Sequence, residues 1–129
     1  MPLNGFRRIV VVDDNHDSTD SLAMLLELTG HEVIRSYDGD DAIEKACACQ
    51  PDVMLLDLAM PKVDGCQVAR RIRQHDGCKD TLLVAITGYT DDAHRVQAKQ
   101  AGFDHYLIKP VEFADLSALL EGRKSNNRP

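Results

Sequence analysis

Short apolar runs alternate with segments of helical periodicity along this chain. The runs are rich in Val, Ile and Leu, as strands are, and Asp, Asn, Gly or Pro residues bound them. The predicted strands are 7–12, 31–36, 52–57, 81–86 and 104–108, and a helix is predicted after each of them. This alternation predicts an α/β fold, in which parallel strands form one sheet and helices cover both of its faces.

Capping residues mark the ends of the predicted helices. The candidate N-caps are Asn15 or Asp17, Asp38, Asp64, and Asp91 or Asp92, and the candidate stops are Gly30, Pro51, Gly102 and Gly122. In the first helix, Leu22, Leu25 and Leu26 recur at helical spacing. The fourth helix offers mainly alanines and one valine to the core, so we expect little apolar burial to hold it.

The third run has four apolar residues between Asp52 and Asp57. A continuous apolar run of this length suits a strand that is buried on both faces. Asp57 then lies at the carboxyl end of that strand, where open α/β sheets bind their ligands. Taken alone, Asp57 is better explained as a cap of the segment that follows it. Whether it belongs to a functional site depends on the residues that follow the other predicted strands.

Polar residues follow the other predicted strands at the equivalent point. Asp13 and Asp14 follow the first strand, Thr87 follows the fourth and Lys109 follows the fifth. In a parallel sheet these ends share one edge, and three carboxylates gathered there repel one another unless a cation lies among them. Oxygen ligands with open positions suit Mg²⁺, and a lysine and a hydroxyl suit a phosphate. The set predicts a phosphoryl-transfer site with Asp57 as the nucleophile.

These residues resemble the receiver domain of two-component response regulators. The resemblance covers residues 6–122 and includes the acidic pair, Asp57 with Met60-Pro61 and Gly65, Thr87, Tyr106 and Lys109-Pro110. It implies a flavodoxin-like doubly wound (βα)5 fold with a five-stranded parallel sheet in the order 2-1-3-4-5. It also implies that residues 123–129 form a polar tail outside the receiver domain and that the Lys109–Pro110 peptide bond is cis.

The resemblance also implies a function, that of a phosphoacceptor switch in a two-component phosphorelay. Asp57 would accept a phosphoryl group from the phosphohistidine of a histidine kinase or a histidine phosphotransfer protein. Mg²⁺ would take carboxylates of Asp14 and Asp57 and a backbone carbonyl near Ala59, and Asp13 would act largely through water. The protein would then signal by protein contact and would be an enzyme only in catalysing its own phosphorylation and slow self-dephosphorylation.

Further roles follow from the same resemblance. Lys109 and Thr87 would contact the phosphoryl oxygens, and Thr87 and Tyr106 would form the switch. Ala59 and Tyr89 would flank the path of the hydrolytic water and tune the hydrolysis. Ala59 has no polar group to orient that water and Tyr89 could shade the phosphoryl group, so we expect slow hydrolysis. Alternatively, Tyr89 points to solvent and has no effect.

Composition and charge narrow the class of protein. A chain of 129 residues fits one domain, and its net charge of −6 argues against unaided nucleic-acid binding. No apolar stretch reaches membrane-spanning length and no secretory segment is recognisable, so we expect a cytoplasmic protein with no membrane partner.

The four cysteines lack the spacing of a zinc site and are expected to be reduced thiols. Arg70, Arg71 and Arg73 give the third helix a basic face.

Two other classes share this architecture. A flavin-binding protein needs hydrogen-bond donors to the cofactor phosphate in its first loop, where this chain has acids. A haloacid-dehalogenase-type phosphohydrolase needs an aspartate where this chain has Ala59.

Residues 123–129 are too few for an effector domain, so we expect a stand-alone regulator. The alternative is a receiver excised from a hybrid histidine kinase or a DNA-binding response regulator. Residues 87–89 and 102–111 look most like hybrid-kinase receivers, and the sequence does not identify the effector.

Overall fold

Residues 7–122, the part of the chain described by the structure (a computed structural model), form five strands in one parallel sheet. The strands are β1 (Arg8–Val12), β2 (Glu32–Ser36), β3 (Val53–Asp57), β4 (Leu82–Thr87) and β5 (His105–Ile108), in the order β2-β1-β3-β4-β5. The helices are α1 (His16–Leu28), α2 (Gly39–Cys49), α3 (Gly65–Gln74), α4 (Asp92–Ala101) and α5 (Phe113–Gly122). The predicted fold and strand order are confirmed.

The ends of the elements also agree closely with the sequence patterns. Asn15, Asp38, Asp64 and Asp91 are the N-caps of the first four helices, and each accepts a hydrogen bond from a backbone amide of the helix that it caps. The short 3₁₀ turn η1 (Asp76–Cys78) was not predicted. Phe6 and the predicted polar tail 123–129 lie outside the described residues.

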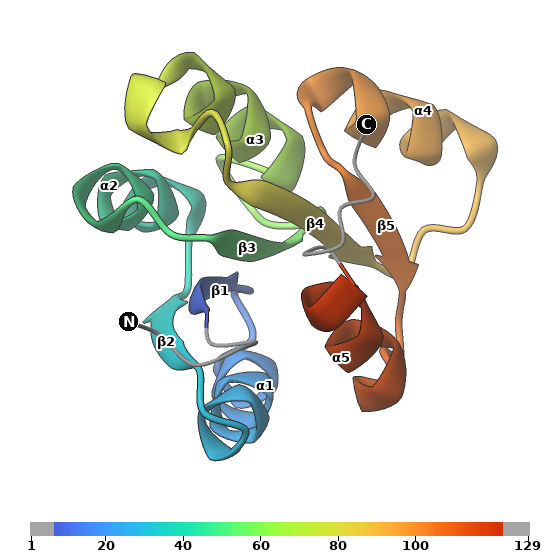
Figure 1. The fold of residues 1–129 in the computed structure, drawn as a ribbon. Coiled ribbons are helices and arrows are strands. Elements are labelled where there is room, and N and C mark those ends of the chain that lie inside the picture. Colours follow the sequence, from blue (N-terminus) through green and yellow to red (C-terminus); the bar gives the residue numbers. More distant parts are fainter. Residues whose placement is uncertain (1–6, 123–129) are drawn as a thin grey trace.

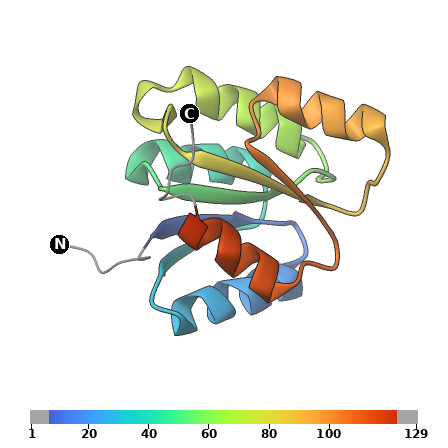
Figure 2. The same ribbon diagram turned by 45° about the vertical axis from the view of Figure 1, so that its right-hand side comes forward.

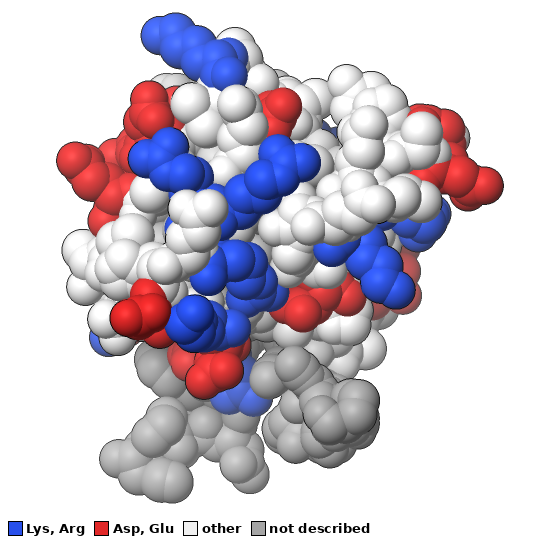
Figure 3. Space-filling model, turned by 90° about the horizontal axis from the view of Figure 1, so that it is seen from above, with Lys and Arg blue, Asp and Glu red and all other residues white. Residues whose placement is uncertain are grey.

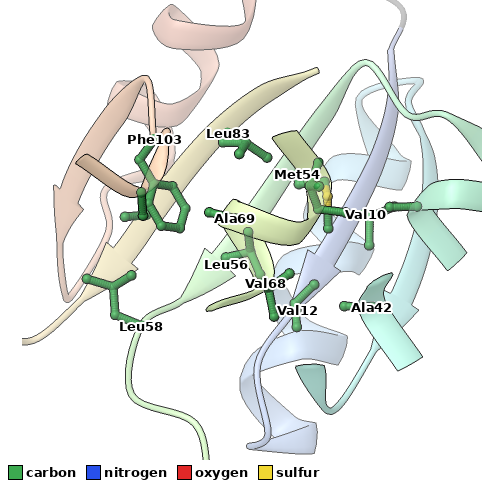
Figure 4. Packing of buried hydrophobic residues seen from close by; sticks show 14 of the residues in the cluster. Val10, Val12, Ala42, Met54, Leu56, Leu58, Val68, Ala69, Leu83 and Phe103 are labelled. Carbon is green, nitrogen blue, oxygen red and sulfur yellow. The ribbon is translucent and has the colours of Figure 1, made fainter. Parts of the chain in front are cut away.

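The sheet separates two apolar cores. Helices α1 and α5 cover one face, and α2, α3 and α4 cover the other (Figures 1 and 2). Successive side chains of β3 alternate between the two cores because strand side chains alternate between faces. Val53 and Leu55 join the core beneath α1 and α5. Met54 and Leu56 join the core beneath α2, α3 and α4, where Leu56 lies beside Val68 (Figure 4). Burial on both faces explains the continuous apolar run before Asp57.

The guanidinium of Arg73 ties the end of α3 to the starts of β4 and β5. Its Nε and Nη2 atoms donate to the carbonyl of Gly102 at 3.0 and 2.8 Å, and Nη1 donates to the carbonyl of Thr81 at 2.7 Å. Nη2 also pairs with Asp104 at 2.7 Å, and the same carboxylate oxygen accepts the amide of Leu83 at 2.9 Å. Arg73 is therefore a structural clamp, whereas the sequence pattern assigned it to an exposed basic face.

The remaining cations of α3 and α4 do form a basic surface. Arg70, Arg71, Arg95 and Lys99 are exposed, and within residues 7–122 none of them has a carboxylate partner. Figure 3, which views the molecule from the side of these two helices, shows Lys and Arg side chains gathered there. The net charge of −6 is thus unevenly distributed, and this face is more basic than the composition indicates.

Candidate functional site

The strand register brings the polar strand ends together. Val12 is paired with Leu56, so Asp13 and Asp14 follow β1 beside the end of β3, where Asp57 lies. Asp57 is in turn paired with Ile86, and Thr87 with Ile108, which precedes Lys109. The structure therefore places all the predicted strand-end residues along one edge of the sheet, as parallel pairing requires.

Three carboxylates form a compact cluster at this edge. Asp13, Asp14 and Asp57 each offer an oxygen, and these oxygens all lie within 4.8 Å of one another. Asp13 and Asp57 are buried, whereas Asp14 is exposed. Two backbone amides hold the buried carboxylates, because Asn15 donates to Asp13 Oδ1 at 3.0 Å and Ala59 donates to Asp57 Oδ1 at 3.2 Å. The other oxygen of each buried carboxylate remains for further partners.

Lys109 faces these remaining oxygens. Its Nζ lies 3.4 Å from Asp13 Oδ2 and 3.5 Å from Asp57 Oδ2. The backbone amide of Lys109 donates to the carbonyl of Thr87 at 2.8 Å, which fixes the point where β5 ends. The Lys109–Pro110 peptide bond is cis, as the resemblance to receiver domains predicted. One ammonium group thus lies between two carboxylates of the cluster.

The environment of Asp57 raises the pKa of its carboxyl above the ordinary value of an aspartate. Burial raises the pKa of the Asp57 carboxyl, and the negative charge of Asp13 raises it further, against the opposing effects of the Ala59 amide and Lys109. A divalent cation among the carboxylates would act in the opposite direction and favour the ionised form. Three carboxylates and one lysine leave an excess of negative charge, so an oxygen-seeking cation such as Mg²⁺ fits the donor set.

Gly65 permits the close packing of α3 against the strand end that carries Asp57. A Cβ atom at Gly65 would lie 2.6 Å from the carbonyl oxygen of Asp57 and 2.9 Å from Cα of Leu58. The amide of Gly65 donates to the carbonyl of Leu58 at 3.2 Å, and a capping box between Asp64 and Gln67 starts the helix. This packing explains why a glycine stands eight positions after Asp57 in the motif.

Tyr89 links the two predicted switch residues. Thr87 is fully buried, and its Oγ accepts a hydrogen bond from the amide of Tyr89 at 3.0 Å. Tyr106 is half-buried, and its hydroxyl donates to the carbonyl of Tyr89 at 2.9 Å. The ring of Tyr89 stacks on His94, with centroids 3.8 Å apart. The sequence pattern predicted neither the hydrogen bond between Tyr106 and Tyr89 nor the stacking of Tyr89 on His94.

An apolar groove opens beside the acidic cluster. A cavity of about 590 Å³ runs between α1 and the segment that follows β5, and Asp13, Asp57 and Lys109 form part of its lining. Its apolar lining includes Leu22, Leu25, Leu55, Ile86 and Val111. Leu25 lines this groove and is 45% exposed, although its helical spacing grouped it with the buried Leu26. The sequence pattern did not reveal this groove.

The sequence of this chain also matches a known protein family. The sequence model of the response regulator receiver domain matches residues 9–121, and the chain belongs to that family. It is a receiver domain of the kind found in two-component signalling, and its acidic cluster fits a phosphoacceptor site. This match favours the receiver domain over the flavin-binding proteins and the haloacid-dehalogenase-type phosphohydrolases that share the α/β architecture.

Relatives with longer chains carry the same domain. The transcriptional regulatory protein PrrA of Mycobacterium leprae is 38% identical over 111 residues, which are 86% of this chain and 47% of PrrA. ResD of Bacillus subtilis is 39% identical over 103 residues, which are 80% of this chain and 42% of ResD. The chain therefore spans about half the length of the curated relatives that it matches.

Solved structures of receivers share the fold. The chemotaxis protein CheY4 of Vibrio cholerae superimposes with a TM-score of 0.86 at 26% identity, covering 91% of this chain and 98% of CheY4. The receiver domain of sensor histidine kinase PA1611 of Pseudomonas aeruginosa superimposes with a TM-score of 0.83 at 28% identity, covering 90% and 95%. That structure has a magnesium ion coordinated in its active site cleft. Among the described residues of this chain, no helix is long and apolar enough to cross a membrane.

Proposed function

We propose that Asp57 is the phosphoacceptor and that Asp13, Asp14, Asp57 and the backbone carbonyl of Ala59 hold Mg²⁺. The observation that carries this proposal is the position of Lys109, whose Nζ lies 3.4 and 3.5 Å from carboxylate oxygens of Asp13 and Asp57 within a cluster of three acids. A phosphoryl group on Asp57 would bring negative charge next to this ammonium. A structural ion pair alone would not require the second and third carboxylates.

The chemistry follows from the two oxygens of Asp57. Oδ1 is held by the Ala59 amide, and Oδ2 faces Lys109. In transfer from a phosphohistidine, a carboxylate oxygen of Asp57 bonds to phosphorus, the bond between phosphorus and the imidazole nitrogen breaks, and the imidazole keeps the electron pair. Bound Mg²⁺ would neutralise charge on the phosphoryl oxygens. Lys109 and the Thr87 hydroxyl bind those oxygens and hold the product.

The apolar groove supports a helical phosphodonor as partner. The groove and the acidic cluster share Asp57 and Lys109 in their lining, so a helix docked in the groove reaches the acceptor. On α1, Met24, Leu25 and Leu28 are 57%, 45% and 77% exposed, which extends the apolar surface beyond the groove. A histidine kinase or histidine phosphotransfer protein that presents its phosphohistidine on an amphipathic helix has the required form.

The phosphorylated protein would lose its phosphoryl group slowly by its own catalysis. Ala59 contributes only backbone groups near Asp57, and Tyr89 is occupied in a stack with His94. Neither side chain offers a base that holds water in line with the bond between phosphorus and Asp57. The output of the switch would be contact with an effector protein, through the surface of α4, β5 and α5. The cytoplasmic location expected from the sequence stays a prediction.

A second candidate concerns the context of the domain. The receiver could act as one module of a longer DNA-binding regulator or hybrid kinase, because the curated relatives are about twice as long as the matched segment. In that case the contact with the effector is made within one chain. The phosphoacceptor chemistry is the same in both cases.

Phosphorylation by a small acyl phosphate tests the central proposal. Incubation with acetyl phosphate and Mg²⁺ should add one phosphoryl group to the wild-type protein, as measured by intact mass, and none to Asp57→Asn. Asp80→Asn is the matched control, because Asp80 is exposed and has no ion pair among the described residues. Equal phosphorylation of wild type and Asp57→Asn would rule out Asp57 as the acceptor.

A further inference from the structure

Thr19 is a polar side chain that is withdrawn from solvent beside the acidic cluster. It lies close to the start of α1 and is 0% exposed. Its hydroxyl donates to the carbonyl oxygen of Asp13 at 2.8 Å and also lies 3.1 Å from that of Asn15. A buried hydroxyl must find a partner, whereas an apolar side chain would fill the same space at no such cost. The bond to Asp13 therefore explains the presence of a hydroxyl at this position.

The polar groups of Asp13 have partners in different parts of the fold. The amide of Asp13 donates to the carbonyl of Ser36, at the end of β2, at 3.2 Å, and its carbonyl accepts the Thr19 hydroxyl from α1. Its carboxylate oxygen Oδ1 accepts the amide of Asn15 at 3.0 Å. The position of Asp13 thus depends on both β2 and α1, and Thr19 makes the bond from α1.

The support from β2 is independent of Thr19. Ser36 is fully buried, and its hydroxyl donates to Asp41 Oδ2 at 2.8 Å. Lys45 pairs with the same carboxylate oxygen at 2.9 Å and donates to the carbonyl of Arg35 at 2.8 Å. This network joins the end of β2 to α2. Loss of the Thr19 hydroxyl would therefore leave the β2 contact in place and release the loop after β1 only on the side of α1.

The acidic cluster pushes on this loop when no cation is bound. The carboxylate oxygens of Asp13, Asp14 and Asp57 lie within 4.8 Å of one another and repel, and Lys109 brings a single positive charge. Repulsion favours a loop displaced from Asp57, and the Thr19 bond opposes that displacement. A displaced loop has to be drawn back when Mg²⁺ binds, which lowers the apparent affinity in proportion to the fraction of protein with the loop in place.

From this arrangement we infer that Thr19 is a positioning residue for the metal, which holds the backbone of Asp13 so that the acidic pair stays within reach of Mg²⁺. The inference rests on the proposed function. Thr19 is not itself a ligand, because it is buried and its hydroxyl donates to a backbone carbonyl. Its contribution is to the affinity for Mg²⁺ and not to the transfer of the phosphoryl group.

Titration with Mg²⁺, followed by NMR at the amides of residues 13–15 and 57–59, measures this contribution. Thr19→Val keeps the shape of the side chain and removes the hydroxyl, so the Kd for Mg²⁺ should rise about fivefold, a factor within the range for one hydrogen bond. Thr29→Val is the matched control, because the Thr29 hydroxyl donates to the carbonyl of Leu26 at 2.9 Å at the other end of α1. Its Kd for Mg²⁺ should equal that of wild type.

A second pair of variants isolates the hydroxyl even if Thr19→Val does not fold. Thr19→Ser and Thr19→Ala both lose the methyl group and differ only in the hydroxyl. Thr19→Ser should bind Mg²⁺ within about twofold of wild type, and Thr19→Ala should bind it about fivefold more weakly than Thr19→Ser. Circular dichroism verifies that both variants are folded.

The rate of phosphorylation by acetyl phosphate separates a role in metal binding from a general loss of structure. Thr19→Ala should need about fivefold more Mg²⁺ than Thr19→Ser to reach half of its maximal rate, and the two maximal rates should be equal. Equal Kd values for Mg²⁺ in these two variants would overturn the inference, as would a rate of Thr19→Ala that stays low at saturating Mg²⁺. An equal weakening in Thr29→Val would also overturn it. Absence of Mg²⁺ binding by wild type would contradict the proposed function instead.

Discussion

The two sides of the strand-end site are built in different ways. On the side of β1 and β3, Asp13 and Asp57 are buried, and backbone amides and Lys109 fix their carboxylates. On the side of β4 and β5, Thr87 is buried, but its partners Tyr89 and Tyr106 are held by contacts near the surface. The two buried carboxylates proposed for the chemistry are thus fixed within the protein, whereas Tyr89 and Tyr106 are attached to Thr87 and to each other by few bonds.

Helices α3 and α4, which follow the two sides of the site, differ in how much apolar surface they bury. Helix α3 begins with a capping box beside Asp57 and buries Val68, Ala69 and Ile72 in the core. Helix α4 begins beside Tyr89 and buries only two alanines. Side-chain burial of this kind determines which elements open at low free-energy cost. The comparison predicts that changes on the β3 side alter stability or chemistry, and that changes on the β4 side alter signal transmission.

Removal of the metal should have the largest effect on the chemical side. A chelator should abolish phosphorylation by acetyl phosphate, because the excess charge of the three carboxylates would then be uncompensated. In metal-free protein, added Mg²⁺ should raise the thermal unfolding midpoint, since a ligand of the native state stabilises it. In Asp13→Asn this rise should be smaller. Phosphorylation at an unchanged rate in chelator would contradict the assignment of the cluster to a metal.

Truncation of core side chains should separate the two helices by stability. Ile72→Ala in α3 removes a fully buried side chain and should lower the free energy of unfolding by about 3 kcal/mol. Val96→Ala in α4 removes an exposed side chain and should change it by less than about 0.5 kcal/mol. Urea unfolding of both variants measures the difference. Equal losses would show that α4 is held as firmly as α3.

A pair of glycine substitutions compares the two strand ends directly. Gly65→Ala places a methyl group 2.6 Å from the Asp57 carbonyl oxygen, and overpacking of this kind should cost about 2 kcal/mol of stability. Gly88→Ala, next to Thr87, meets no heavy atom within 4 Å and should be nearly neutral. Thermal unfolding of the two variants gives the answer. A neutral Gly65→Ala would mean that α3 can shift away from β3 without cost.

The smallest expected effect concerns the lifetime of the phosphoryl group. Ala59→Asn supplies an amide that can orient a water, and Tyr89→Ala removes the ring that the family resemblance assigns to the path of that water. Each should speed the decay of phosphorylated protein by about tenfold, which corresponds to about 1.4 kcal/mol of activation free energy. The decay is timed by intact mass after removal of acetyl phosphate. If both variants decay like wild type, hydrolysis is controlled from elsewhere in the site.

Much of the fold could be predicted because it depends on local patterns. Apolar runs, caps and terminating residues lie within a few positions of one another, and the parallel sheet brings the strand ends to one edge. The acidic cluster with Lys109 was predictable for the same reason. The contacts of Arg73 with Gly102 and of Tyr106 with Tyr89 join residues 29 and 17 positions apart, and no local pattern encodes them. The groove was missed because its lining joins Leu22 and Leu25 of α1 to Pro110 and Val111, which lie far away in the sequence.

The clamp made by Arg73 has a mechanical consequence for the whole edge of the sheet. It fastens the amino ends of β4 and β5, through Thr81, Gly102 and Asp104, to the end of α3, at the opposite end of these strands from Asp57. The pairing of β4 with β5 is therefore fixed where it begins, next to Leu83 and Asp104. Thr87 and Lys109, at the other end of the same two strands, owe their relative position to a register that Arg73 sets at the far end of the sheet.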